Sequence, residues 1–148
     1  MKKALVTIKQ AQELKALGFR DEVSNTMSVK IGSIRQSAPY NHNRFGGWVS
    51  IPTVDEAIDW LRRKYDIMIY NTSAPFVDPT DPKHRIVHNL SVKYCNRRDG
   101  WNGRVNIGYA GNSHNIYAIK RRAINIAISW LKQRKNVEKK LQARTTRH

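Results

Sequence analysis

The chain has 148 residues, 40% of them hydrophobic and 9% aromatic, which is enough to bury the core of one domain and too apolar for a disordered chain. Its 27 Lys and Arg residues against 11 Asp and Glu residues give a net charge of +16. The single cysteine, Cys95, excludes an intramolecular disulfide and a thiolate zinc cluster, and no apolar run approaches the roughly 20 residues of a membrane span.

Two helices are predicted in the first half of the chain by their N-terminal signals. The segment Thr7-Ile8-Lys9-Gln10 has the pattern of a capping box, and the apolar spacing after it predicts a helix over residues 8–17. The segment Thr53-Val54-Asp55-Glu56 repeats the pattern and predicts a helix to Tyr65, with an ion pair between Asp59 and Arg63.

The region between these helices predicts strands. Met27, Val29 and Ile31 alternate with polar residues, which indicates a half-buried strand. Residues 37–47 are rich in Pro, Asn, Gly and Arg and predict an exposed loop. Residues 48–51 predict a second strand, which ends at Pro52.

After the second helix the pattern turns to β structure. Residues 67–70 predict a fully buried strand, and residues 71–83, with three prolines, predict a long surface loop. Residues 90–94 and 105–109 alternate and predict a two-stranded meander in which Tyr109 points into the core.

The C-terminal part predicts a long helix over residues 114–134, whose apolar arc covers more than half of its circumference. We therefore expect an α+β fold: a small antiparallel or mixed sheet of about five strands packed against three helices. The expected organisation is one α+β domain over residues 4–134 and a basic tail over residues 135–148. The tail is either a frayed helical extension or a disordered arm.

Two segments carry a resemblance to known proteins. The segments Gln12-Glu13-Leu14-Lys15-Ala16-Leu17-Gly18-Phe19 and Pro52-Thr53-Val54-Asp55-Glu56-Ala57-Ile58-Asp59-Trp60-Leu61-Arg62-Arg63-Lys64-Tyr65 resemble the "ELK-LGF" and "PT--EA-DW-R-KY" motifs of short uncharacterised proteins of Bacteroidetes and their tailed phages, including crAss-like phages. The resemblance implies a similar order of elements and a phage or mobile-element context. It implies no catalytic residues, and this chain differs in its heavy basic charge and in its tail after Lys132.

An enzymatic site has weak support in the sequence. Asp78, Asp81, His84 and His88 lie close together and suggest a divalent-metal nuclease, but Asp is common in Pro-rich turns and no metal-ligand spacing is matched. Cys95 has no neighbour that would activate it. We therefore expect no enzymatic activity, no metal site and no cofactor.

The basic residues are the main candidates for binding because ordinary solubility needs a net charge of only about 2–8. They form a meander group, a group at the start of the last helix and a tail group. The candidate nucleic-acid-binding residues are Lys93, Arg97, Arg98, Trp101, Arg104, Lys120, Arg121, Arg122, Lys132, Arg134, Lys135, Lys139, Lys140, Arg144 and Arg147.

Two candidates have specific expectations. Trp101 lies in the predicted turn of the meander, where it could stack on unpaired bases. Lys120 falls inside the apolar arc, so we expect its ammonium to snorkel outward, with Asp99 or a bound phosphate as the alternative partners.

The leading hypothesis is a phage or mobile-element accessory protein that binds nucleic acid or packaged DNA without sequence preference. One form of this hypothesis is a virion component whose basic arm faces packaged DNA beside other virion proteins. The alternative is a protein–protein interaction module, such as a capsid accessory or an inhibitor of a host defence, anchored on an acidic partner by Phe45, Trp48 and Trp101. The expected location is the host cytoplasm or the virion, without a signal peptide or membrane attachment.

Overall fold

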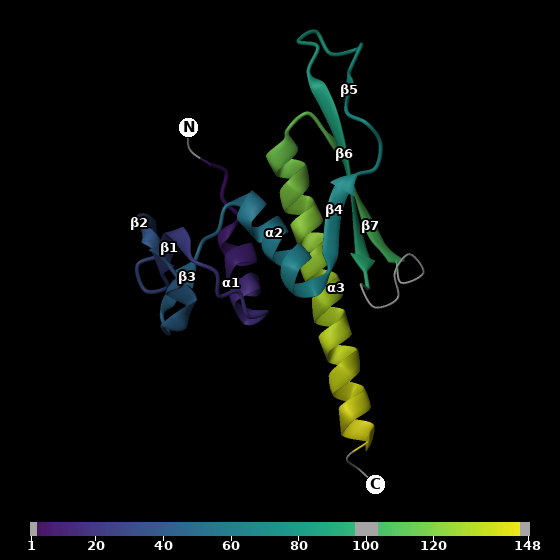
Figure 1. The fold of residues 1–148 in the computed structure, drawn as a ribbon. Helices are drawn as coiled ribbons and strands as arrows, with labels where there is room; N and C mark the ends of the chain where they lie inside the picture. Colours follow the sequence, from purple (N-terminus) through teal and green to yellow (C-terminus); the bar gives the residue numbers. More distant parts are fainter. Residues whose placement is uncertain (1–2, 97–103, 146–148) are drawn as a thin grey trace.

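Three α-helices and seven strands make up residues 3–96 and 104–145, the part of the chain that this computed structural model describes. The strands form two antiparallel sheets, one of three strands and one of four. The predicted α+β class is therefore confirmed, with the strands divided between two sheets (Figure 1).

The first two helices begin where their capping boxes predict. Helix α1 spans Ile8–Ala16 and helix α2 spans Val54–Tyr65. In each helix the capping threonine, Thr7 or Thr53, accepts a hydrogen bond from the amide three residues on, and the Gln or Glu at that position accepts one from the threonine amide. Local side-chain chemistry defines both starts.

The three-stranded sheet has the order β2-β1-β3 and contains β1 (Val23–Ser28), β2 (Ile34–Tyr40) and β3 (Trp48–Ser50). A short 3-10 helix, η1 (His42–Arg44), connects β2 to β3. The expected loop over residues 37–47 was therefore wrong in its first part. All seven residues of β2 are exposed, so this edge strand shows no burial pattern that its sequence could reveal.

The strand expected from Met27 to Ile31 was also placed wrongly. Strand β1 ends at Ser28, whose carbonyl accepts from the amides of Ile31 and Gly32 at 3.2 and 2.8 Å to close a turn. Val29 and Ile31 are consequently more than half exposed.

The four-stranded sheet contains β4 (Ile67–Asn71), β5 (Phe76–Val77), β6 (Ile86–Cys95) and β7 (Arg104–Ser113), and β6 pairs with the other three. Strand β4 is not fully buried as expected, because its residues alternate between the core and the surface and leave Met68 exposed.

The expected inward direction of Tyr109 was wrong, since its side chain is 55% exposed. The register between β6 and β7 shifts twice, after Leu90 and after Val92. Each bulge moves the following side chains out of phase with a simple two-residue alternation. Tyr109 instead donates a hydrogen bond to the side chain of Asn89 on the paired strand, at 3.1 Å.

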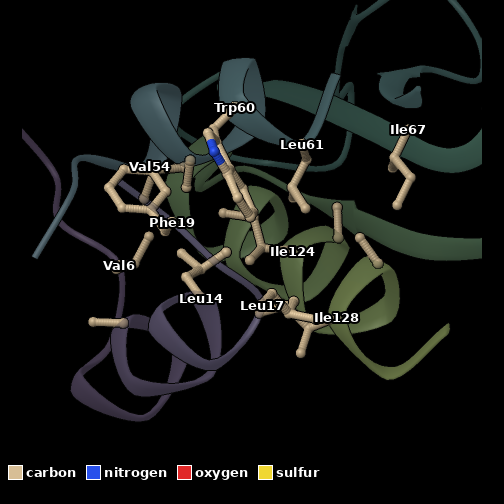
Figure 2. Close-up of a cluster of buried hydrophobic side chains, with 14 of the residues drawn as sticks. Val6, Leu14, Leu17, Phe19, Val54, Trp60, Leu61, Ile67, Ile124 and Ile128 are labelled. Atoms are coloured by element: carbon tan, nitrogen blue, oxygen red, sulfur yellow. The ribbon is translucent and has the colours of Figure 1, made fainter. Parts of the chain in front are cut away.

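Helix α3 spans Ile116–Thr145 and packs against both the other two helices and the four-stranded sheet. The Asn115 side chain accepts from the amides of Tyr117 and Ala118, both at 3.1 Å, and so caps its start. The helix contacts α1, α2 and strands β4, β6 and β7. One buried apolar cluster contains residues of all three helices and both sheets, and Figure 2 shows Ile124 and Ile128 of α3 beside Leu14, Leu17 and Leu61.

Helix α3 continues well past this core. Leu131 is its last buried residue, and every residue from Lys132 to Arg144 is exposed. Figure 1 shows this C-terminal end running beyond the sheet and the other helices. Of the two forms left open for the tail, the structure has the helical one as far as Thr145. Within the described residues, no helix combines the length and the apolar character that crossing a membrane requires.

Candidate nucleic-acid interface

The exposed end of α3 concentrates positive charge. We call residues 132–144 the distal segment and residues 116–131 the proximal segment of this helix. The distal segment carries one carboxylate, Glu138, and the six predicted cations Lys132, Arg134, Lys135, Lys139, Lys140 and Arg144.

Two of these cations are held by the protein itself at the base of the distal segment. Lys132 forms an ion pair with Glu13 of α1 at 3.0 Å. The Arg134 guanidinium lies over the rings of Tyr94 and Trp130, 4.7 and 5.2 Å from their centroids, and reaches Glu138 at 3.7 Å. These contacts fix the start of the distal segment against the body of the molecule.

The other four cations are not neutralised. Lys135, Lys139, Lys140 and Arg144 are exposed and form no ion pair with any described residue. Lys135 and Lys139 are four residues apart, as are Lys140 and Arg144, and like charges at this spacing destabilise a helix by about 0.2–0.5 kcal/mol per pair. An anion bound along this segment would remove that repulsion.

The proximal segment differs because two of its three cations have partners in the protein. Lys120 forms an ion pair with Asp55 in the first turn of α2 at 2.8 Å, so Asp55 occupies the role expected for Asp99 or a phosphate. The Arg121 side chain donates to the carbonyl of Leu5 at 3.0 Å. Arg122 is exposed without an ion pair among the described residues.

The meander cations belong to a different surface. Val92 is buried in the core with α3, so the alternation of β6 turns Lys93 to the opposite face, where its ammonium lies 4.5 Å from the Tyr70 ring centroid. Arg104 begins β7 opposite Cys95. The structure therefore does not bring Lys93 together with the distal segment.

Four of the predicted residues lie outside the described part of the chain. They are Arg97, Arg98, Trp101 and Arg147, and Asp99 lies outside it as well.

Most carboxylates form ion pairs, and among the described residues only those of Glu13 and Glu138 pair with cations of the distal segment. The predicted pair of Asp59 with Arg63 is present at 2.7 Å, Arg62 joins it, and these hydrogen bonds lower the pKa of Asp59. The ion pairs of Asp21, Asp55, Asp78 and Asp81 also lie outside the distal segment.

The two acids of the 78–88 region have structural partners. Asp81 is buried and accepts from the Arg85 guanidinium at 2.7 Å, and this bond holds the pKa of Asp81 well below its ordinary value. Asp78 accepts from Thr80 and lies 3.3 Å from the His114 ring. Across the residues that the structure describes, no three His, Cys, Asp or Glu side chains are grouped as metal ligands.

One exposed surface was only partly identified from the sequence. Tyr40, Phe45 and Trp48 lie around η1 beside the three-stranded sheet, and all three are exposed. The sequence identifies Phe45 and Trp48 as candidate protein anchors, but not Tyr40, because residues 37–47 predict a loop.

No protein-family model, curated protein or solved structure matches the chain.

Proposed function

We propose that this protein is a non-enzymatic accessory protein of a phage or mobile element that binds nucleic acid without sequence preference through the distal segment of α3. The observation that carries the proposal is the set of four cations, Lys135, Lys139, Lys140 and Arg144, that lie on the exposed distal segment and form no ion pair with any described residue. A virion component with this segment against packaged DNA is one form of the same proposal.

The dimensions of the distal segment fit a nucleic-acid backbone. Its 13 residues extend about 20 Å at the helical rise of about 1.5 Å per residue. A duplex strand presents one phosphate about every 3.4 Å, so several phosphates lie within that length. Contacts of this kind position a protein without reading bases, which is why we propose binding that ignores sequence.

The test is the salt dependence of binding to a labelled duplex of random sequence. Each neutralised phosphate contributes about −0.9 to the slope of log affinity against log salt, so four contacts give a slope of about −3.6. The double variant Lys139→Ala/Lys140→Ala should bind more weakly and lose about two units of slope.

A matched control distinguishes the effect of where the two charges are removed from the effect of lowering the net charge. Lys3 and Lys83 are exposed lysines without an ion pair among the described residues. Lys3 lies beside Thr53 and Glu56 at the start of α2, and the Lys83 amide donates to Asp81, which lies 3.8 Å from His114 just before α3, so both are far from the distal segment. The double variant Lys3→Ala/Lys83→Ala has the same net charge as the test variant and should keep the wild-type slope. Equal losses in both variants, or no binding at low salt, would rule out the proposed surface.

The alternative is an acidic protein partner, and the exposed Phe45 and Trp48 favour it because exposed aromatic residues often anchor protein interfaces. Recovering the tagged protein with its bound partners, with and without nuclease, distinguishes the two. A complex that survives nuclease treatment supports the protein partner, and one that is lost supports nucleic acid.

A further inference from the structure

A second exposed surface lies on the three-stranded sheet, far along the sequence from α3. We call Tyr40, Phe45 and Trp48 the aromatic platform. The rings of Tyr40 and Phe45 lie nearly parallel, with 12° between their planes and 6.1 Å between their centroids. The Trp48 amide donates to the Phe45 carbonyl at 3.4 Å, which places the third aromatic residue in the same turn.

Hydrogen bonds to the core and to α1 fix the backbone of the platform. The Asn43 side chain donates to the carbonyl of Phe19 in the core at 2.9 Å and accepts from the amide of Ser50 at 2.8 Å. The Lys15 ammonium of α1 donates to the Trp48 carbonyl at 2.7 Å. Because the backbone is already positioned, the protein would lose little conformational entropy when a ligand stacks on these rings.

The chain segment that carries the platform is basic. Residues 23–54 contain no Asp or Glu and include Lys30, Arg35 and Arg44, whereas the exposed Glu22 directly precedes Val23, the register partner of Tyr40. Arg44 directly precedes Phe45. Arg35 is in register with Thr26, which is also paired with Ser50, so alternation places Arg35 and Trp48 on the same face of the sheet.

We infer that the aromatic platform stacks the bases of single-stranded nucleic acid while the neighbouring arginines contact its phosphates. Exposed rings beside positively charged side chains are the combination that binds unpaired strands. A duplex hides the faces of its bases, so this surface discriminates between strand forms, whereas the distal segment contacts either form. The inference rests on the proposed function, because it identifies the form of nucleic acid that the protein prefers.

The test compares the affinity of a short labelled oligothymidylate with that of a duplex of the same length. Phe45→Leu keeps apolar bulk but removes the aromatic face, and stacking on one base is worth about 1–3 kcal/mol, which converts to roughly a 5- to 150-fold loss of single-strand affinity. Duplex affinity should stay unchanged. Trp48→Leu should act in the same way and serves as the second variant if Phe45→Leu fails to fold.

Phe76→Leu is the matched control because Phe76 is 50% exposed on the other sheet and Phe45 is 52% exposed. It should leave both affinities at wild-type values. Unchanged oligothymidylate binding in folded Phe45→Leu and Trp48→Leu would overturn the inference and assign the platform to a protein partner. That result would leave the proposed function standing if duplex binding still depends on Lys139 and Lys140, whereas absence of binding to either strand form would overturn both.

Discussion

The two segments of α3 belong to one continuous helix but have opposite relations to the rest of the protein. The proximal segment buries its apolar arc and pairs Lys120 with Asp55. Beyond the ion pair of Lys132 and the aromatic contacts of Arg134, the distal segment buries nothing and leaves four cations without a partner among the described residues. Both segments are helical and positively charged. They differ in how many of their cations have partners elsewhere in the protein.

The largest expected effect tests whether the proximal segment packs in the core and the distal segment does not. Ile128→Ala in the proximal segment should lower the free energy of unfolding by about 2–5 kcal/mol, because Ile128 is fully buried and the substitution leaves a cavity. Leu141→Ala in the distal segment should change it by no more than about 0.5 kcal/mol, because Leu141 is exposed. Denaturant unfolding measures both, and equal losses would mean that the distal segment packs against the body.

The next expected effect is on the stability of the protein at low pH. The Arg85 guanidinium and backbone amides lower the pKa of the Asp81 carboxyl well below its ordinary range, so the folded protein favours the ionised form. That stabilisation is complete above about pH 4 and is lost as the pH falls toward the lowered pKa. Asp81→Asn should reduce stability at neutral pH and flatten its decline in acid, as measured by denaturant unfolding at several pH values. The control Glu138→Gln, in the exposed distal segment, should preserve the wild-type acid dependence.

A smaller effect is expected at the start of α3. Asn115→Ala removes the side chain that caps the amides of Tyr117 and Ala118, and it should cost about 1 kcal/mol in thermal or denaturant unfolding. Affinity for nucleic acid should not change, because the cap lies at the opposite end of the helix from the distal segment. A loss of affinity without a loss of stability would show that binding extends to the proximal segment.

The smallest expected effect tests the contribution of the one carboxylate in the distal segment. Glu138→Gln removes the only carboxylate of the distal segment and its exposed pair with Arg134. Exposed pairs contribute about 0–1 kcal/mol, so stability should hardly change. Affinity for a duplex should rise slightly at low salt because local repulsion of phosphate is removed. A drop in affinity would indicate that Glu138 orients Arg134 for binding.

Features with local causes were predictable from the sequence. The starts of α1 and α2 follow from Thr7 and Thr53 because a capping box involves residues only three apart. The buried arc of α3 follows from its helical spacing. Strand β2 was not predictable because it forms by pairing with β1 while all its side chains remain exposed. The direction of Tyr109 depends on the bulge at Ile107, between the pairs Lys93–Asn106 and Val92–Gly108, which no alternation reveals.

The candidate site was predictable in composition but not in arrangement. The sequence identifies the cations of the distal segment, yet it does not show that Lys120 meets Asp55, 65 residues away, or that Lys93 lies on Tyr70. Such pairings decide which cations are available, and they arise only when distant segments pack together. The aromatic platform likewise requires the turn that brings Tyr40 beside Phe45.

The most direct test measures duplex affinity against salt for the wild-type protein and for a variant in which Lys135, Lys139, Lys140 and Arg144 are all alanine. If these side chains are the phosphate contacts, the variant should lose about 3.6 units of slope while unfolding at a denaturant concentration no lower than that of the wild type. A folded variant that retained the full slope would contradict the account, because the counterions released on binding would then come from another surface.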